Sequence, residues 1–231
     1  MKLPLLLSIP HAGTHIPPEV RDLCILQQQD ILADYDAEAK AIYTALEEQV
    51  AGCCTTDIAR SLIDFNRAPD QVGGDGVIKS HTSWNVPVYR QFPDNNLIRV
   101  LLEKYYFPYH EKLCLAGSNS FIRLGIDCHT MSVLGPPAAP DPGQKRPLVC
   151  LSYGDGTCPE KWIKRLASCF SASFNDKVSI NSPFQGGYII RKHASELYWV
   201  QIEISQTMAY SVEFKKNCLL EGLQHFCHTM F

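Results

Sequence analysis

The stretch Phe-Ile-Arg-Leu-Gly-Ile-Asp-Cys-His, residues 121–129, decides the fold, because it joins a short apolar run to two ionisable residues. We predict a strand over residues 121–127 that is buried between layers of helices. Asp127 and His129 then lie at its carboxyl end. Ligands of open α/β sheets bind outside the carboxyl ends of the strands, so this stretch predicts a functional site at that edge.

Two further predicted strands bring ionisable residues toward the same edge. Residues 3–9 form an apolar run that leads to His11, and residues 198–204 form another that contains Glu203. Two histidines and several carboxylates could therefore converge at one edge of the sheet.

The rest of the chain alternates between short apolar runs and longer helical patterns. This alternation predicts an α/β fold, a three-layer sandwich with a mostly parallel or mixed central sheet. No internal repeat or linker divides the chain, so we expect a single domain over residues 1–231. Residues 135–147 are expected to form a loop. Further strands are expected at 61–65, 148–152, 178–180 and 188–190, and helices at 34–50, 95–115 (interrupted by Pro108), 159–174 and 207–226.

Composition excludes several classes of protein. The net charge is -3, with 45% hydrophobic and 19% charged residues, which is an ordinary globular composition. No dense basic cluster suggests a nucleic-acid partner, and no apolar run is long enough for a membrane span or a signal peptide. The ten cysteines form no Cys-x-x-Cys pair, so we expect buried free thiols in a cytoplasmic protein.

The two strand-end histidines, His11 and His129, are candidate zinc ligands, although either could be a structural histidine. A catalytic zinc site has three N or O ligands and an open position for water. We expect the third ligand to be Asp34 or Glu38, since residues four apart share one face of the predicted helix. These acids could instead complement the helix dipole, and Asp36, on a different face, is the least favoured candidate.

Glu203 is the candidate general base. It lies between two isoleucines of a predicted strand, and burial raises the pKa of a carboxyl group toward neutrality. The alternative is a structural glutamate bonded to the backbone or to an arginine. Asp127 is a candidate to orient a ligand histidine.

A second set of residues could bind an anionic substrate. Arg67 and Arg191 are candidates to hold carboxylates, with Asn66 and Gly187 beside them. Each arginine could equally form a surface salt bridge, and Gly187 could simply be part of a turn.

Six segments, in order, resemble motifs of the N-formylglutamate amidohydrolase family. They are Ser-Ile-Pro-His-Ala-Gly-Thr-His-Ile-Pro-Pro-Glu-Val (8–20), Ile-Asp-Phe-Asn-Arg-Ala-Pro (63–69), Tyr-Tyr-Phe-Pro-Tyr-His-Glu-Lys-Leu (105–113), Asp-Cys-His-Thr-Met (127–131), Phe-Gln-Gly-Gly-Tyr-Ile-Ile-Arg (184–191) and Gln-Ile-Glu-Ile (201–204).

The resemblance implies a zinc carboxypeptidase-like, phosphorylase/hydrolase-like fold that binds Zn²⁺ and hydrolyses N-formyl-L-glutamate to glutamate and formate. By position, His11 and His129 match metal-site histidines, Glu203 matches a catalytic carboxylate, and Arg67 and Arg191 match positions suited to substrate carboxylates. The chain departs from the family at residues 34–38, where Asp-Tyr-Asp-Ala-Glu stands in place of Asp-Trp-His-Val-Asp.

The expected partner is a small anionic substrate derived from an amino acid, and the chain could form a homo-oligomer. Two alternatives remain at this point: a hydrolase of another N-acyl amino acid or a small peptide, and a non-catalytic protein that binds an acidic metabolite. Glu203 argues against the second, since a binding protein has no need of a buried general base.

Overall fold

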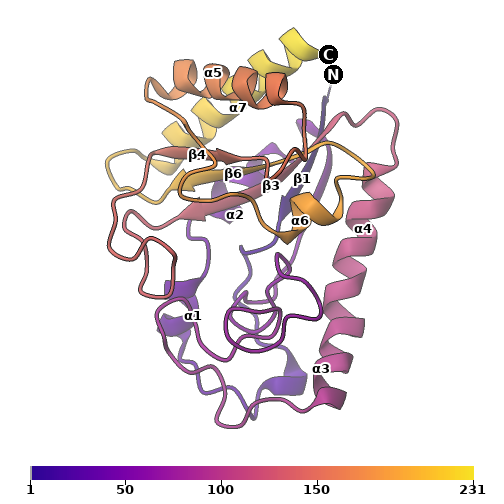
Figure 1. Ribbon diagram of the computed structural model, residues 1–231, viewed down its shortest axis with the longest axis vertical. Helices are drawn as coiled ribbons and strands as arrows, with labels where there is room; N and C mark the ends of the chain where they lie inside the picture. The colour runs from indigo at the N-terminus through magenta and orange to yellow at the C-terminus, as the bar shows by residue number, and fades with distance from the viewer. Residues whose placement is uncertain (1) are drawn as a thin grey trace.

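The computed structural model describes residues 2–231, and its centre is a six-stranded sheet with helices on both faces (Figure 1). The strands lie in the order β2-β1-β3-β6-β4-β5. The first four run parallel, β4 is antiparallel to β6, and β5 is parallel to β4. This confirms the predicted α/β sandwich with a mostly parallel sheet. The strands are β1 (Leu3–Ile9), β2 (Val50–Thr55), β3 (Leu124–Met131), β4 (Val149–Ser152), β5 (Ser179–Ile180) and β6 (Trp199–Ser205).

One face of the sheet is covered by α2 (Ala39–Tyr43), α5 (Glu160–Phe174) and α7 (Val212–Met230). The last two lie side by side in Figure 1. α5 is amphipathic and buries its apolar stripe against α7 and the sheet. Close contact depends on Gly222 of α7, where an added Cβ would lie 2.2 Å from the ring of Phe170.

The other face is covered by α6 (Tyr188–Lys192) and by a long helical segment with three parts. These parts are α3 (Asn95–Leu101), a π-helical turn over Leu102–Tyr106, and α4 (Phe107–Gly117). Pro108 has no N–H to donate to the preceding turn, so the regular hydrogen-bond pattern changes just before it. The predicted helix with an interruption at Pro108 is therefore confirmed.

Irregular segments fill the space beyond the carboxyl ends of the strands, in the lower half of Figure 1. They comprise the chain around the 3-10 turn Pro18–Val20 and α1 (Gln28–Asp34), and the segment between β2 and α3. A second cluster of buried apolar residues includes side chains from these segments and from the sheet, so the segments pack on the sheet through a hydrophobic core.

The predicted helix over 34–50 is wrong, and this error affects the site. α1 ends at Asp34 and α2 begins at Ala39, because Glu38 adopts a left-handed conformation with φ 68° that no α-helix contains. A 3-10 turn, Thr44–Leu46, follows α2, and β2 then begins at Val50, a strand that the sequence analysis missed.

Two predicted strands are also wrong. Residues 61–65 form turns, in which the N–H groups of Leu62 and Ile63 both donate to the carbonyl of Ala59. Residues 188–190 begin α6. Both runs are buried, and a short apolar run indicates burial without choosing between a strand and another structure. The remaining predicted elements are confirmed with boundaries shifted by a few residues, and residues 135–147 form a loop.

Over residues 2–231, none of the helices is both long enough and apolar enough to cross a membrane. All ten cysteines in this part of the chain are free thiols, and six of them are buried. The expectation of buried free thiols therefore holds for most of them.

Candidate metal and active site

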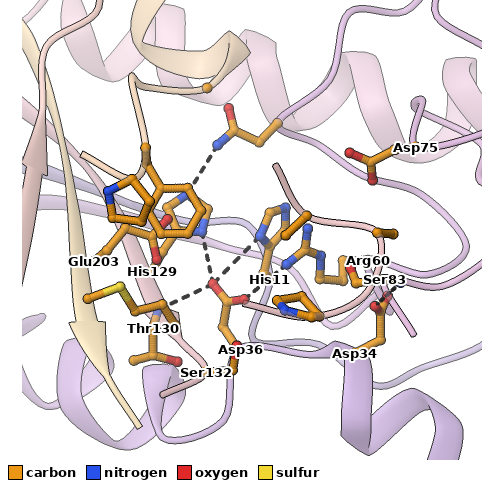
Figure 2. A pocket seen from close by; sticks show the side chains of 18 of the residues that line it. His11, Asp34, Asp36, Arg60, Asp75, Ser83, His129, Thr130, Ser132 and Glu203 are labelled. Atoms are coloured by element: carbon orange, nitrogen blue, oxygen red, sulfur yellow. Dashed lines mark hydrogen bonds and ion pairs between the residues drawn. The ribbon is translucent and has the colours of Figure 1, made fainter. Parts of the chain in front are cut away.

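A cavity of about 500 Å³ opens at the carboxyl ends of β1, β3 and β6, where the sequence predicted a site. Its floor includes His11, which follows β1, together with His129 of β3 and Glu203 of β6. Its walls come from the irregular segments, including the loop over residues 135–147. The cavity therefore collects side chains from distant parts of the sequence (Figure 2).

A buried group of His11, Asp36 and His129 could bind a metal ion, since its ligand atoms all lie within 4.8 Å of one another. Asp36 Oδ2 lies 2.8 Å from His129 Nδ1 and 3.6 Å from His11 Nδ1. The left-handed turn at Glu38 and a hydrogen bond from the Asp36 N–H to the carbonyl of His11, 3.1 Å, hold Asp36 in this place.

The donor set fits a metal ion. Within residues 2–231, the buried Nδ1 of His11 has no hydrogen-bond partner, while its Nε2 lies 2.7 Å from Asp64 Oδ1. The Nε2 of His129 lies 3.0 Å from Asp127 Oδ2. Metal-ligating histidines typically engage a carboxylate through the nitrogen that does not face the metal. Two nitrogens and one carboxylate oxygen, beside an open cavity, also match the ligands of a catalytic zinc site.

The charges of the site favour a cation among these three residues. Burial alone would raise the pKa of Asp36, but His11 and His129 hold it well below its ordinary value. Burial would lower the pKa of His129, but Asp127 and Asp36 raise it well above its ordinary value. The carboxylates thus stabilise a positive charge at a place where a metal ion would supply one.

The structure corrects the expectation that Asp34 or Glu38 is the third member of the group. Asp34 Oδ1 accepts a hydrogen bond from the Ser83 N–H, 2.7 Å, and Glu38 forms an ion pair with Lys215, 2.6 Å. Asp36, the least favoured candidate, occupies the position because residues 35–38 are not helical. The departure of this segment from the family pattern was the available signal, but spacing alone could not choose among its three acids.

Glu203 lies beside His129, since the two residues pair in the register of β6 and β3. Its side chain lines the cavity and accepts a hydrogen bond from Gln201 Nε2, 2.9 Å. Burial raises the pKa of Glu203 to about 7. A carboxyl group in this state can both accept and return a proton near neutral pH.

Asp127 and Asn66 form a buried support behind the histidine. Asn66 Nδ2 donates to Asp127 Oδ2, 2.7 Å, and Asn66 Oδ1 accepts from the Ile189 N–H, 2.8 Å. Gly187 packs directly on Asn66, and its N–H donates to Gln201 Oε1, 2.7 Å. The geometry thus gives Asn66 and Gly187 a positioning role, and their predicted contact with substrate stays a prediction.

The two predicted carboxylate-binding arginines differ in position. Arg67 lines the cavity and forms an ion pair with Asp75, 2.5 Å. Arg191 is not among the described lining residues, and its guanidinium donates to the carbonyls of Gly186, 2.5 Å, and Gly187, 3.0 Å. The structure therefore corrects the expectation for Arg191, which fixes the loop before α6.

Three more cations stand in or behind the cavity wall. Arg60 binds Asp36 and Asp64, with distances of 3.2 and 3.4 Å. Arg146, which the sequence analysis missed, forms a two-pronged ion pair with Asp141 at 2.8 and 2.7 Å. Lys79 is fully buried, and it contacts Asp64 at 3.1 Å and Asp75 at 2.5 Å.

A family model and two related proteins point to the same family. The family model described as N-formylglutamate amidohydrolase matches residues 3–209. N-formylglutamate deformylase from Pseudomonas aeruginosa is 24% identical over 219 residues, 89% of this chain and 81% of that protein. The enzyme of the same name from Pseudomonas putida is 23% identical, with the same shares covered.

Solved structures share the fold. The crystal structure of N-formylglutamate amidohydrolase from Ralstonia eutropha JMP134 matches with a TM-score of 0.80 and 20% identity, over 98% of this chain and 94% of that one. A protein from Agrobacterium tumefaciens matches with a TM-score of 0.76 and 18% identity, over 100% and 91%. At these identities the likeness concerns the fold alone.

Proposed function

The chain belongs to the N-formylglutamate amidohydrolase family, a family of hydrolases that act on linear amide bonds, and on this premise we propose that it is a zinc-dependent deformylase. Its substrate would be N-formyl-L-glutamate or a related N-acyl amino acid, and its products the free amino acid and formate. The observation that carries the proposal is the buried His11–Asp36–His129 group beside Glu203 at one end of the cavity.

His11, Asp36 and His129 would hold a Zn²⁺ ion, which when bound polarises a carbonyl and lowers the pKa of water. Glu203 accepts a proton from the water that adds to the formyl carbon. It then delivers that proton to the amide nitrogen as the carbon–nitrogen bond breaks. One water is consumed, the formyl group leaves as formate, and the amine of the amino acid is released.

Two further carboxylates orient the histidines. Asp64 holds His11 through Nε2, and Asp127 holds His129 in the same manner. Each contact fixes which ring nitrogen is free and where it points. Arg60 contacts both Asp36 and Asp64, so it fixes the position of Asp36 in the metal group relative to Asp64, which orients His11.

Paired substitutions test this proposal. Glu203→Gln should keep the metal and lower kcat by roughly a hundredfold to ten-thousandfold, because only the proton acceptor is removed. Glu213→Gln, in the exposed first turn of α7, is the matched control. Asp36→Asn should lose the metal, whereas Asp34→Asn should retain it. The measurements are elemental analysis of protein purified without chelator and turnover of N-formyl-L-glutamate. Near-wild-type kcat in metal-loaded Glu203→Gln would show that this glutamate is structural.

A further inference from the structure

Each cation in or behind the cavity wall already has a carboxylate of the chain as its partner, in the part of the protein that the structure describes. Arg60 is paired with Asp36 and Asp64, Arg67 with Asp75, and Arg146 with Asp141 (and Lys79 with Asp64 and Asp75). An anionic substrate therefore meets no unpaired arginine or lysine side chain among these residues. It must exchange places with one of these carboxylates, or leave its own charge without a partner.

Asp75 is the carboxylate that can be exchanged most easily. Its side chain is 60% exposed, whereas those of Asp36, Asp64 and Asp141 are 4%, 0% and 12% exposed. Exposed ion pairs contribute little to stability, while breaking a buried pair is strongly unfavourable. Displacing Asp75 therefore costs the least free energy, so we expect an incoming anion to replace this carboxylate.

The geometry of Asp75 resembles that of a bound ligand. One carboxylate oxygen lies 2.5 Å from Lys79 Nζ and the other 2.5 Å from Arg67 Nη2, so Asp75 bridges two cations. Asp75 is also one of the residues that line the cavity (Figure 2). Lys79 is buried and keeps Asp64 as a partner without Asp75. Arg67 would lose the only carboxylate that it contacts among the described residues.

The loop that carries Asp75 can release the side chain without moving its backbone. The Asp75 carbonyl accepts from Arg67 Nε at 2.8 Å, and the neighbouring Gly74 N–H donates to Ser80 Oγ at 3.0 Å. Side-chain positions at Gly73 and Gly74 face open space, with no heavy atom within 4 Å. Because the Asp75 side chain itself is 60% exposed, its rotation would suffice to clear the two cations.

We propose that Asp75 is a resident counterion that occupies the binding position for a substrate carboxylate, and that the substrate's carboxylate displaces it from Arg67 and Lys79. Asp75 is then a specificity-determining residue: a substrate without a carboxylate in this position gains nothing from displacing it, and an anion must compete with it. This inference rests on the proposed function for the identity of the substrate, although not for the exchange of carboxylates itself.

The test compares Asp75→Asn with Asp70→Asn, an exposed aspartate of the same segment that does not line the cavity. In Asp75→Asn, KM for N-formyl-L-glutamate should fall by roughly threefold to tenfold, the scale of an exposed ion pair, with the effect on KM rather than kcat. Two substrate analogues, N-formyl-glutamine and the α-amide of N-formyl-glutamate, each lack one of the two carboxylates. The fall in KM of Asp75→Asn should disappear for one of these two analogues. For N-formyl-glutamine amide, which has no carboxylate, KM should be the same in the wild type and in both variants.

A binding measurement separates this inference from the proposed function. Calorimetric titration with glutarate should show tighter binding to Asp75→Asn than to the wild type by a similar factor, and glutaramide should bind both equally. If the wild type fails to hydrolyse N-formyl-L-glutamate but glutarate still binds the variant more tightly, the proposed function fails and the counterion stands. If the wild type hydrolyses the substrate while Asp75→Asn leaves KM and glutarate affinity unchanged, or weakens both, the counterion is overturned.

Discussion

The missing side chain of Gly187 makes room for Asn66. An added Cβ would stand 2.3 Å from both the Nδ2 and the Oδ1 of Asn66. The conformation of Gly187, with φ -88° and ψ -168°, is extended backbone open to any residue, so the need for glycine is steric. Asn66 holds Asp127, which holds His129, and Asn66 Nδ2 also lies 3.1 Å from His129 Nε2, so a methyl group at Gly187 acts on the metal group through Asn66.

We therefore expect Gly187→Ala to lower metal affinity or kcat/KM by roughly tenfold to a hundredfold, the usual effect of disturbing residues that support metal ligands. Gly117→Ala, at the end of α4, is the control, since its nearest contact would be an ordinary 3.9 Å. The measurements are a competition titration with a chelating dye and steady-state kinetics. Unchanged values in Gly187→Ala would mean that Asn66 can move without disturbing His129.

At the scale of elements, Glu38 joins α2 to α7 rather than serving the site. Its carboxylate lies 2.6 Å from the Nζ of Lys215, whose side chain is fully buried. Removing one partner of such a pair leaves a buried charge without compensation. Glu38→Ala should lower the free energy of unfolding by about 3 kcal/mol, as measured by urea denaturation, and leave the metal content unchanged.

The double variant Glu38→Ala, Lys215→Met should recover much of that loss, because an apolar residue removes the uncompensated charge. If Glu38→Ala instead loses the metal but keeps its stability, Glu38 is a metal ligand.

The elements that the sequence predicted well are those whose pattern and environment agree. β1, β3 and β6 are rich in apolar residues and are buried along most or all of their length, and α5 shows a clear amphipathic period. Residues 61–65 have the same apolar character, but the loop chain that covers them provides their burial. The left-handed backbone conformation of Glu38 does not change the pattern of apolar residues, so the break between α1 and α2 could not be predicted.

At the scale of the whole molecule, the site joins several segments that are far apart in sequence. Strand ends locate His11, His129 and Glu203, because the edge of a parallel sheet follows from its topology. The position of Asp36 depends on a loop conformation, and the pairing of Arg67 with Asp75 depends on two loops packing together. Such tertiary contacts between irregular segments are what single-sequence reasoning could not supply.

Buried His110 links several parts of this assembly. Its Nε2 donates to the carbonyl of Phe65, 3.0 Å, between Asp64 and Asn66 of the site. Its Nδ1 lies 3.0 Å from the Nε2 of His193, at the end of α6, and the Nδ1 of His193 lies 2.8 Å from Glu196 Oε2. α4, the site segment and α6 therefore meet at one buried histidine, where a positive charge is unfavourable.

Protonation of His110 should consequently destabilise the fold in acid. Burial, followed by His193, lowers the pKa of His110 to about 3, whereas in an unfolded chain it is about 6.5. The unfolded state thus binds a proton that the folded state rejects. The stability contribution is complete above about pH 6.5 and is lost as the pH falls toward about 3, by up to about 1.4 kcal/mol per pH unit.

His110→Gln removes this titration, so we expect it to be less stable than the wild type at neutral pH, with a gap that narrows by about 2 kcal/mol between about pH 7 and about pH 5. Urea denaturation at several pH values measures the gap, and subtracting the two curves cancels the other titrating groups that both proteins share. His228→Gln, at an exposed position on α7, should follow the wild type throughout. If the wild type and His110→Gln stay a constant distance apart across this range, His110 takes up its proton as readily in the folded protein as in the unfolded chain. Its bond to Phe65 then fixes the site segment without making the fold sensitive to acid.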